Sequence, residues 1–354
     1  MGSVKHLAVS LVSDLSELFP HMNKSPREKL AIMIATLIET RSCNTMELAA
    51  RLPLETDRAE SRYTWIERFL SATTIDDMDI MAELASRLLA AVCGHGKTIV
   101  VSLAQTSLGD DRAIGMVSVR VAGRALPLFW TVRRTAGNIA IKDYLPLLDR
   151  LKSCLTKDSK VLILADRFFG TPELIAACQC HGWSWRIRLK VNLTLHHDSG
   201  ELSVSDIASL GKVVTGANLC GSGVITNIGY VDDRGHKEAW FIAMDAQPTR
   251  QRTLDYGLRW SIESMFSDFK SRCFGLQHTR LQRPDRISRI LLVLALALIW
   301  ATANGYIEEK KENLLAALSR SPVPLFLYAN ADYDISSDVL NACLLYTSPS
   351  PRDS

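Results

Sequence analysis

The stretch Val161–Gly170, VLILADRFFG, decides the fold that we predict for this chain. Its first five residues form a continuous apolar run, which is typical of a strand buried on both faces of a sheet. Asp166 follows at once, and in open α/β sheets the functional side chains collect at the carboxyl ends of the strands. Asp166 is therefore a candidate catalytic residue, although an aspartate after a strand is often only a turn or helix cap.

The segments on either side complete a mixed sheet. Upstream, β-branched runs separated by short turns predict consecutive antiparallel strands over residues 98–104, 113–121 and 125–132. Downstream of these, helices are expected over 142–152 and 171–181, and a further strand over 183–191. This order of three antiparallel strands, helix, strand, helix and strand fits an α/β fold with a ribonuclease-H-like mixed sheet.

The rest of the chain divides around this sheet. Four apolar patterns of helical period between Ser25 and Ala91 indicate a small all-helical domain before it, and Gly-rich turns with short strands indicate a β-rich insertion after it. We expect a helical N-terminal DNA-binding domain (1–95), the first part of the ribonuclease-H-like core (96–191), the β-rich insertion (192–248), the rest of the catalytic core with C-terminal helices (249–320) and a poorly defined end (321–354). Basic residues that could contact DNA from the helical domain are Lys24, Arg27, Arg51, Arg58 and Arg62, although helix packing accounts for each of them equally well.

Composition excludes several classes of protein. With 47% apolar and 22% charged residues, the 354-residue chain is globular rather than disordered or fibrous. The longest apolar run, residues 290–303, is shorter than the roughly 18 residues of a bilayer span and predicts a buried helix. The N-terminus lacks a secretion signal and the eight cysteines are scattered, so we expect reduced thiols, a cytoplasmic location and no membrane.

A second polar pattern lies in DYGLRWSIESMFSDFK, residues 255–270. At about 100° per residue, Tyr256, Arg259, Glu263 and Lys270 share one helix face. An apolar stripe on the other side would pack on the sheet and consists of Leu258, Ile262, Met265 and Phe269. We expect the polar face to lie beside Asp166 if this helix flanks the strand, and a solvated amphipathic helix is the alternative.

The net charge of the chain, 41 basic minus 38 acidic residues or +3, is concentrated around this pattern. Residues 250–289 hold nine basic and four acidic residues, a local charge of +5. A basic segment with one inward carboxylate suggests phosphate contacts around a metal-binding acid.

The spacing Y-x2-R-x3-E-x6-K resembles the YREK signature of DDE transposases from bacterial insertion sequences of family four. Asp166, in ADRFFG, resembles the second acid of that family, and Trp240 resembles the family's tryptophan that stacks on a flipped base beside the cleaved end. Packing in the core is the alternative for Trp240. The similarity runs from about Asn44 to about residue 290.

The resemblance implies metal-dependent cleavage and strand transfer at terminal inverted repeats. Three carboxylates would hold two Mg²⁺ or Mn²⁺ ions, with Asp166 and Glu263 as catalytic and metal-binding residues. Tyr256, Arg259 and Lys270 would grip phosphates near the transferred end. The implied partners are double-stranded DNA, as transposon ends and target, and a second copy in a homodimer, in the nucleoid of a bacterial cytoplasm.

One position departs from the family pattern. The first acid should end the strand 98–104, but the sequence there reads Ala104-Gln105-Thr106. Alanine cannot bind a metal, and even loss of an outer-sphere partner costs roughly 10–100-fold. We therefore expect impaired cleavage, or a catalytically inactive transposase-derived DNA-binding protein or inhibitor. An Asp→Ala change, natural decay and rescue by Asp110 or Asp111 remain open explanations.

The last residues, 343–354, read CLLYTSPSPRDS. This string resembles a translated sequencing-adapter read-through, and a flexible Ser/Pro tail is the alternative. We expect it to be artefactual and the native sequence to be cut near Ala342.

Overall fold

The computed structural model describes residues 2–56, 58–93, 97–197, 200–209, 213–232 and 238–318. The predicted end segment 321–354, with its adapter-like tail, lies outside these residues. The chain forms two compact units. The first contains residues up to 70, residues 267–280 and the described residues from 290 onward, and the second contains residues 71–266 and 281–289.

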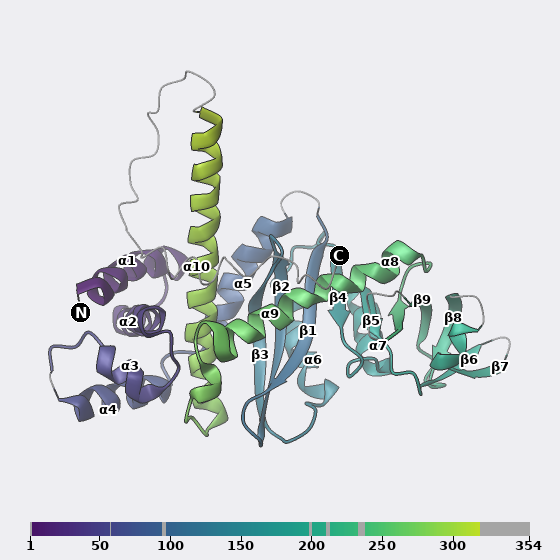
Figure 1. Cartoon of the computed structure of the whole chain (residues 1–354), viewed down its shortest axis with the longest axis horizontal. Coiled ribbons are helices and arrows are strands. Elements are labelled where there is room, and N and C mark those ends of the chain that lie inside the picture. The colour runs from purple at the N-terminus through teal and green to yellow at the C-terminus, as the bar shows by residue number, and fades with distance from the viewer. Residues whose placement is uncertain are drawn as a thin grey trace. The chain divides into compact units, whose positions relative to one another are not determined.

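The second unit is built on one ten-stranded sheet with the strand order β3-β2-β1-β4-β5-β10-β9-β8-β6-β7 (Figure 1). Its first half consists of β1 (Ile99–Ser107), β2 (Arg112–Val121), β3 (Arg124–Arg134), β4 (Val161–Ala165) and β5 (Ser184–Arg188). The first three strands are antiparallel, β4 runs parallel to β1, and β5 runs parallel to β4. This topology confirms the predicted ribonuclease-H-like mixed sheet.

The β-rich residues after β5 extend this same sheet. They form β6 (Thr194–His197), β7 (Gly200–Ser203), β8 (Val213–Leu219), β9 (Ile225–Val231) and β10 (Trp240–Met244). β10 returns beside β5 and pairs with it antiparallel, and β9 continues outward from β10. The insertion therefore joins the core through backbone hydrogen bonds.

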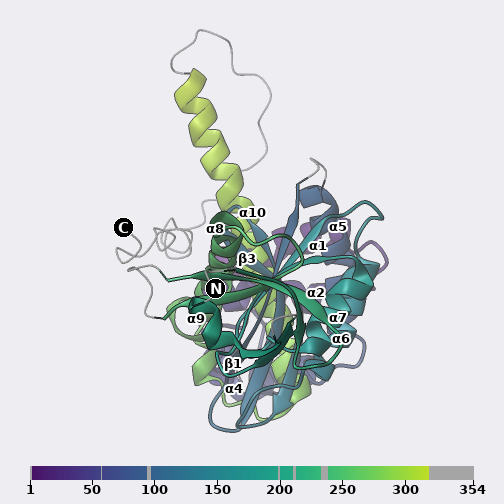
Figure 2. The same ribbon diagram turned by 90° about the vertical axis from the view of Figure 1, so that its right-hand side faces the viewer.

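Helices cover both faces of the sheet. The helices α5 (Asp77–Cys93), α6 (Leu145–Ser153) and α7 (Pro172–His181) lie on one face, and α8 (Arg250–Leu254) and α9 (Trp260–Ser267) lie on the other (Figure 2). Every residue of β4 is buried, as the apolar run 161–165 predicts. Local signals set the ends of α7, because the Thr171 side chain caps its first turn and Gly182 ends it at φ +70°.

The first unit is helical. It contains α1 (Gly2–Leu18), α2 (Lys24–Thr40), α3 (Thr45–Arg51), α4 (Ala59–Leu70) and the part of α10 (Pro284–Leu318) that follows Arg289. The helical region begins earlier than the predicted start near Ser25. The signal for α1 was present, because its buried residues Val4, Ala8, Leu11 and Leu15 recur at helical spacing.

One predicted DNA contact in this unit has a structural role. Arg62 is buried and its guanidinium donates to the carbonyl oxygens of Thr56 at 2.8 Å and Ala50 at 3.3 Å. For this arginine the helix-packing alternative holds.

The apolar run within α10 is largely buried, with residues 290–298 no more than 5% exposed. The helix α10 extends beyond this run. The expectation that the apolar segment is too short to span a bilayer is therefore wrong with respect to its length. Of the described residues, Pro284–Gly305 is long and apolar enough for a span, but 61% of its most apolar window is buried within the protein, as in the core helix of many soluble proteins. The described cysteines are all free thiols, as expected.

Candidate catalytic site

Strand pairing places Ala104 next to Asp166. The parallel ladder between β1 and β4 pairs Leu103 with Ala165 and keeps the same offset over five residue pairs. The ladder ends at that pair, and continuing its register by one residue would set Ala104 opposite Asp166, with both side chains on one face of strands about 4.8 Å apart. Ala104 is 1% exposed, and its side chain offers only a methyl group at this position.

Asp166 is a carboxylate in a sheltered position. Its Oδ1 accepts a hydrogen bond of 2.8 Å from the backbone N–H of Phe168, which holds the turn after β4. Burial raises the pKa of Asp166 above its ordinary value, the Arg259 guanidinium opposes this shift, and the Glu263 carboxylate adds to it. Three of the predicted neighbours, Tyr256, Arg259 and Glu263, thus lie within electrostatic range of Asp166.

Arg259 connects the other members of this group. One guanidinium nitrogen lies 2.8 Å from Oε1 of Glu263, and the guanidinium carbon lies 5.7 Å from the centre of the Tyr256 ring. Tyr256 and Arg259 belong to a 3₁₀ helix, Asp255–Arg259, in which side chains three residues apart lie directly above one another. Glu263 is one turn further along in α9, and Arg259 contacts both Tyr256 and Glu263.

The structure corrects the expectation of one continuous helix with a single polar face. Residues 250–272 run through α8, the 3₁₀ helix, α9 and a π-helix, Asp268–Arg272, so a constant 100° per residue does not apply. Tyr256 and Arg259 are buried, as are Ile262, Met265 and Phe269 of the apolar stripe, instead of lying on an opposite, solvated face. Lys270 lies in the π-helix, which belongs to the first unit.

Trp240 lies in the core. It is 5% exposed and packs in a cluster with Ile242, Met244 and Tyr256, with its ring edge-on to Tyr256 at a centroid distance of 5.0 Å. Stacking on a base would therefore require the indole to leave this cluster.

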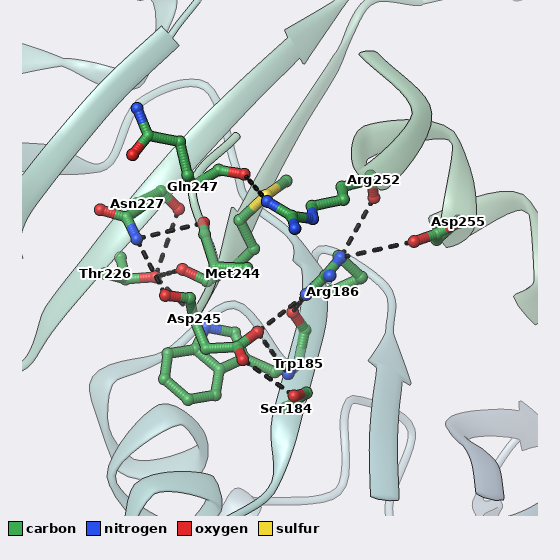
Figure 3. A network of polar contacts seen from close by, with 11 residues as sticks. Ser184, Trp185, Arg186, Thr226, Asn227, Met244, Asp245, Gln247, Arg252 and Asp255 are labelled. Atoms are coloured by element: carbon green, nitrogen blue, oxygen red, sulfur yellow. Dashed lines mark hydrogen bonds and ion pairs between the residues drawn. The ribbon is translucent and has the colours of Figure 1, made fainter. Parts of the chain in front are cut away.

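A buried polar network fixes the start of the 3₁₀ helix (Figure 3). Arg186, in β5, is 6% exposed and lies 2.8 Å from Oδ1 of Asp245. Its Nε donates to the carbonyl oxygen of Arg252 at 3.1 Å and lies 3.9 Å from Oδ2 of Asp255. Ser184 donates to the second oxygen of Asp245 at 2.8 Å. One arginine therefore joins β5, the residue after β10, α8 and the residue before Tyr256.

This network was not predicted from the sequence. A signal was available, because Arg186 stands between the apolar residues Trp185 and Ile187, and a buried arginine requires carboxylate or carbonyl partners. Burial raises the pKa of Asp245, but the hydrogen bonds from Ser184 and Arg186 outweigh it and leave this pKa below its ordinary value.

A polar cavity of about 340 Å³ opens beside Asp166 at the ends of β1 and β3. Asp166 and Asp110 both line it, together with Phe168, Gln105 and Asn138. Asp111, the other residue considered as a substitute acid, pairs with Arg112 at 2.9 Å. Among the described residues, no three His, Cys, Asp or Glu side chains come together as a metal site.

Residues 123–300, half of the 354-residue chain, match the family of the transposase DDE domain. The chain belongs to this family. No curated protein matches the sequence. The matched part of this DDE transposase includes Asp166 and the whole segment 255–270, and it begins downstream of Ala104.

DDE transposases are ribonuclease-H-like enzymes that bind DNA, often act as oligomers and in general use divalent metal ions. Among the described residues, those expected from the sequence to hold the metal ions do not supply three carboxylates. Asp166 and Glu263 offer two carboxylates, Ala104 offers none, and one oxygen of Glu263 is already bonded to Arg259. Asp110 lines the same cavity as Asp166 and is a further carboxylate there.

Proposed function

We propose that this DDE transposase is of the family-four insertion-sequence type and binds terminal inverted repeats as a homodimer, with metal-dependent cleavage and strand transfer impaired by Ala104. The register of Ala104 against Asp166 carries the proposal. An aspartate at position 104 would lie on the strand next to Asp166, on the same face, where two carboxylates can share a cation.

The arrangement of residues 256–263 supports DNA binding at this site. Arg259 is held between the Tyr256 ring and Glu263, and its guanidinium can offer two parallel N–H donors to a phosphate. Because Glu263 now accepts from Arg259, a phosphate at the site would compete with that carboxylate. Lys270 is the third phosphate ligand in this proposal, and Trp240 a base-stacking residue that must first leave its cluster.

The remaining assignments belong to the same proposal. Residues 1–95 form the helical DNA-binding domain, residues 96–191 and 249–320 the catalytic core, and residues 192–248 its insertion. The partners are transposon ends and target DNA in the bacterial nucleoid. The alternative, a catalytically inactive transposase-derived DNA-binding protein or inhibitor, is favoured by Ala104 itself.

Restoring the missing carboxylate tests the proposal. We expect Ala104→Asp to raise the rate of Mg²⁺- or Mn²⁺-dependent cleavage, measured on a plasmid with the ends of the encoding element, by about 100-fold or more. This is because the loss of an outer-sphere partner alone costs roughly 10–100-fold. Ala104→Asn is the matched control, since it has the same shape and no charge.

Melting curves give a second readout of the same variant. The melting temperature of Ala104→Asp should rise with added Mn²⁺, and that of the wild type should not, because only the variant has three carboxylates to bind the ion. Cleavage and melting that stay at the wild-type level in Ala104→Asp would contradict a single missing acid and leave the inactive DNA-binding protein. Pre-cut DNA ends separate the two functions further. A transposase joins these ends to other DNA, whereas a binding protein only retards their migration in a gel.

A further inference from the structure

We infer that the cavity beside Asp166 binds an unpaired DNA base and that Phe168 is the surface on which the base stacks. This inference rests on the proposed function, because it assigns part of the DNA substrate to a place in the same unit. It adds a binding site next to the catalytic acid that involves neither Trp240 nor the segment 255–270.

The first observation is the exposure of Phe168. Its side chain is 44% exposed, although a phenylalanine at the end of a core strand normally packs inward. The neighbouring Phe169 does so, since it is buried and lies edge-on to Tyr144 at a centroid distance of 4.9 Å. The backbone turn held by Asp166 directs one ring into the core and leaves the other at the surface.

The second observation is the composition of the cavity. Its volume of about 340 Å³ lies within the range of small-ligand pockets, roughly 300–1,000 Å³. Apart from Phe168, its lining consists of polar, glycine and alanine residues, with no large aliphatic side chain. One aromatic ring beside amides, hydroxyls and the carboxylates of Asp110 and Asp166 suits a nucleobase, which has an apolar face and an edge with hydrogen-bond donors and acceptors.

The amides at the wall are already oriented. Gln105 donates to Oδ1 of Asn138 at 2.7 Å and accepts from the backbone N–H of Ile139 at 2.9 Å. This pairing fixes the orientation of the Asn138 amide, whose nitrogen can donate to a base edge. A fixed hydrogen-bonding group loses little entropy on binding, which favours recognition of a planar partner.

Two basic side chains lie at this surface, one over the Phe168 ring and one in the lining of the cavity. The ammonium nitrogen of Lys190 lies 5.6 Å from the centre of the Phe168 ring, and Arg112 lines the cavity. A base stacked on Phe168 would therefore have cations near its own phosphates, as in single-strand binding grooves.

The test compares two labelled DNA duplexes of equal paired length by fluorescence anisotropy. One is blunt, and the other has a short 3′ thymidine overhang that contains 2-aminopurine. We expect the wild type to bind the overhang duplex about 5- to 150-fold more tightly, which corresponds to roughly 1–3 kcal/mol per stacked base, and to quench 2-aminopurine.

Two substitutions of Phe168 form a matched pair, one that removes the aromatic ring and one that keeps it. Phe168→Leu keeps an apolar side chain without a ring and should lose both the preference and the quenching, and Phe168→Tyr should keep both. Affinity for the blunt duplex should stay the same in all three proteins. A Phe168→Leu protein that keeps its preference for the overhang would overturn the inference.

The outcomes also separate the inference from the proposed function. If the wild type binds both duplexes equally well, the base site is wrong and DNA binding stands. If the wild type binds neither duplex at low salt, the proposed function fails and the base site fails with it.

Discussion

Asp166 is a carboxylate whose surroundings favour its neutral form. Burial raises its pKa more than the Phe168 N–H and the Arg259 guanidinium lower it, and the nearby Glu263 carboxylate adds a smaller upward shift. A metal ion would reverse this balance by stabilising the charged form.

The stability cost of Asp166 depends on pH. Because its folded pKa is raised, the folded state binds more protons than the unfolded state between the ordinary value of 3.8 and the folded pKa, so stability falls as pH rises through that window. We expect Asp166→Asn to raise the melting temperature by a few degrees at pH 7, since Asn keeps the acceptor for the Phe168 N–H without the charge.

The same comparison at acid pH is the control. Below pH 3.8 Asp166 is neutral in both states, so the gain of Asp166→Asn should vanish there. An equal gain at both pH values would mean that the substitution acts through packing instead of charge.

At the scale of elements, the segment 250–272 is the least regular part of the site. It changes helix type three times, and the Arg186 network holds it at the first of these changes. Sequence periodicity predicted that Tyr256, Arg259 and Glu263 would be neighbours of Asp166, because 3₁₀ and α spacings both bring such residues together. It could not predict the buried side of Tyr256 and Arg259, since that depends on the sheet they pack against.

Breaking the Arg186 network should destabilise this element. Arg186→Met leaves Asp245 without its guanidinium partner, and removing one member of a buried ion pair costs about 3–5 kcal/mol of the free energy of unfolding. Urea denaturation measures this loss. We expect Arg186→Met/Asp245→Asn to lose less than the sum of the single variants, because the uncompensated charge is gone.

Measuring the stability penalty of Arg186→Met at several pH values shows whether it comes from the ion pair with Asp245. The stabilisation from Asp245 is present above its ordinary pKa of 3.8 and is lost as pH falls through its lower folded value. The penalty of Arg186→Met should therefore shrink at acid pH, and a constant penalty would assign it to packing of the arginine stem.

At the scale of the whole molecule, the charge count overstates the surface offered to DNA. Of the nine basic residues between 250 and 289, Arg289 is 8% exposed and lies 2.5 Å from Oδ1 of Asp77. Arg283 is paired with Asp285, and Arg259 with Glu263. The local charge of +5 holds for the sequence, but part of it is used inside the protein.

Substitutions of two arginines distinguish a role in stability from a role in DNA binding. Arg289→Gln should lower the free energy of unfolding by about 3–5 kcal/mol, because Asp77 stays buried, and should leave the salt dependence of DNA binding unchanged. Arg280→Gln, at an exposed position, should leave stability unchanged and reduce the slope of log affinity against log salt concentration by about 0.9. A reduced slope in Arg289→Gln would contradict its internal role.

The fold was more accessible to sequence reasoning than the site. Apolar runs, turns and caps predicted β1 to β5 and the helices between them, because each signal is local. Phe168 and Arg186 were missed, since their meaning depends on which side of a turn or sheet they face. The position of Ala104 was predicted by resemblance, and the register with Asp166 supplies the physical reason for its importance.

The extension of the sheet beyond β5 has a further consequence. Without residues 192–248, β5 would be an edge strand with a row of unpaired N–H and C=O groups, which promotes pairing between copies and aggregation. With them, that side of the sheet ends at β7, a strand of only four residues. We therefore expect residues 192–248 to prevent β5 from pairing with other copies, and a shortened chain that lacks them to precipitate.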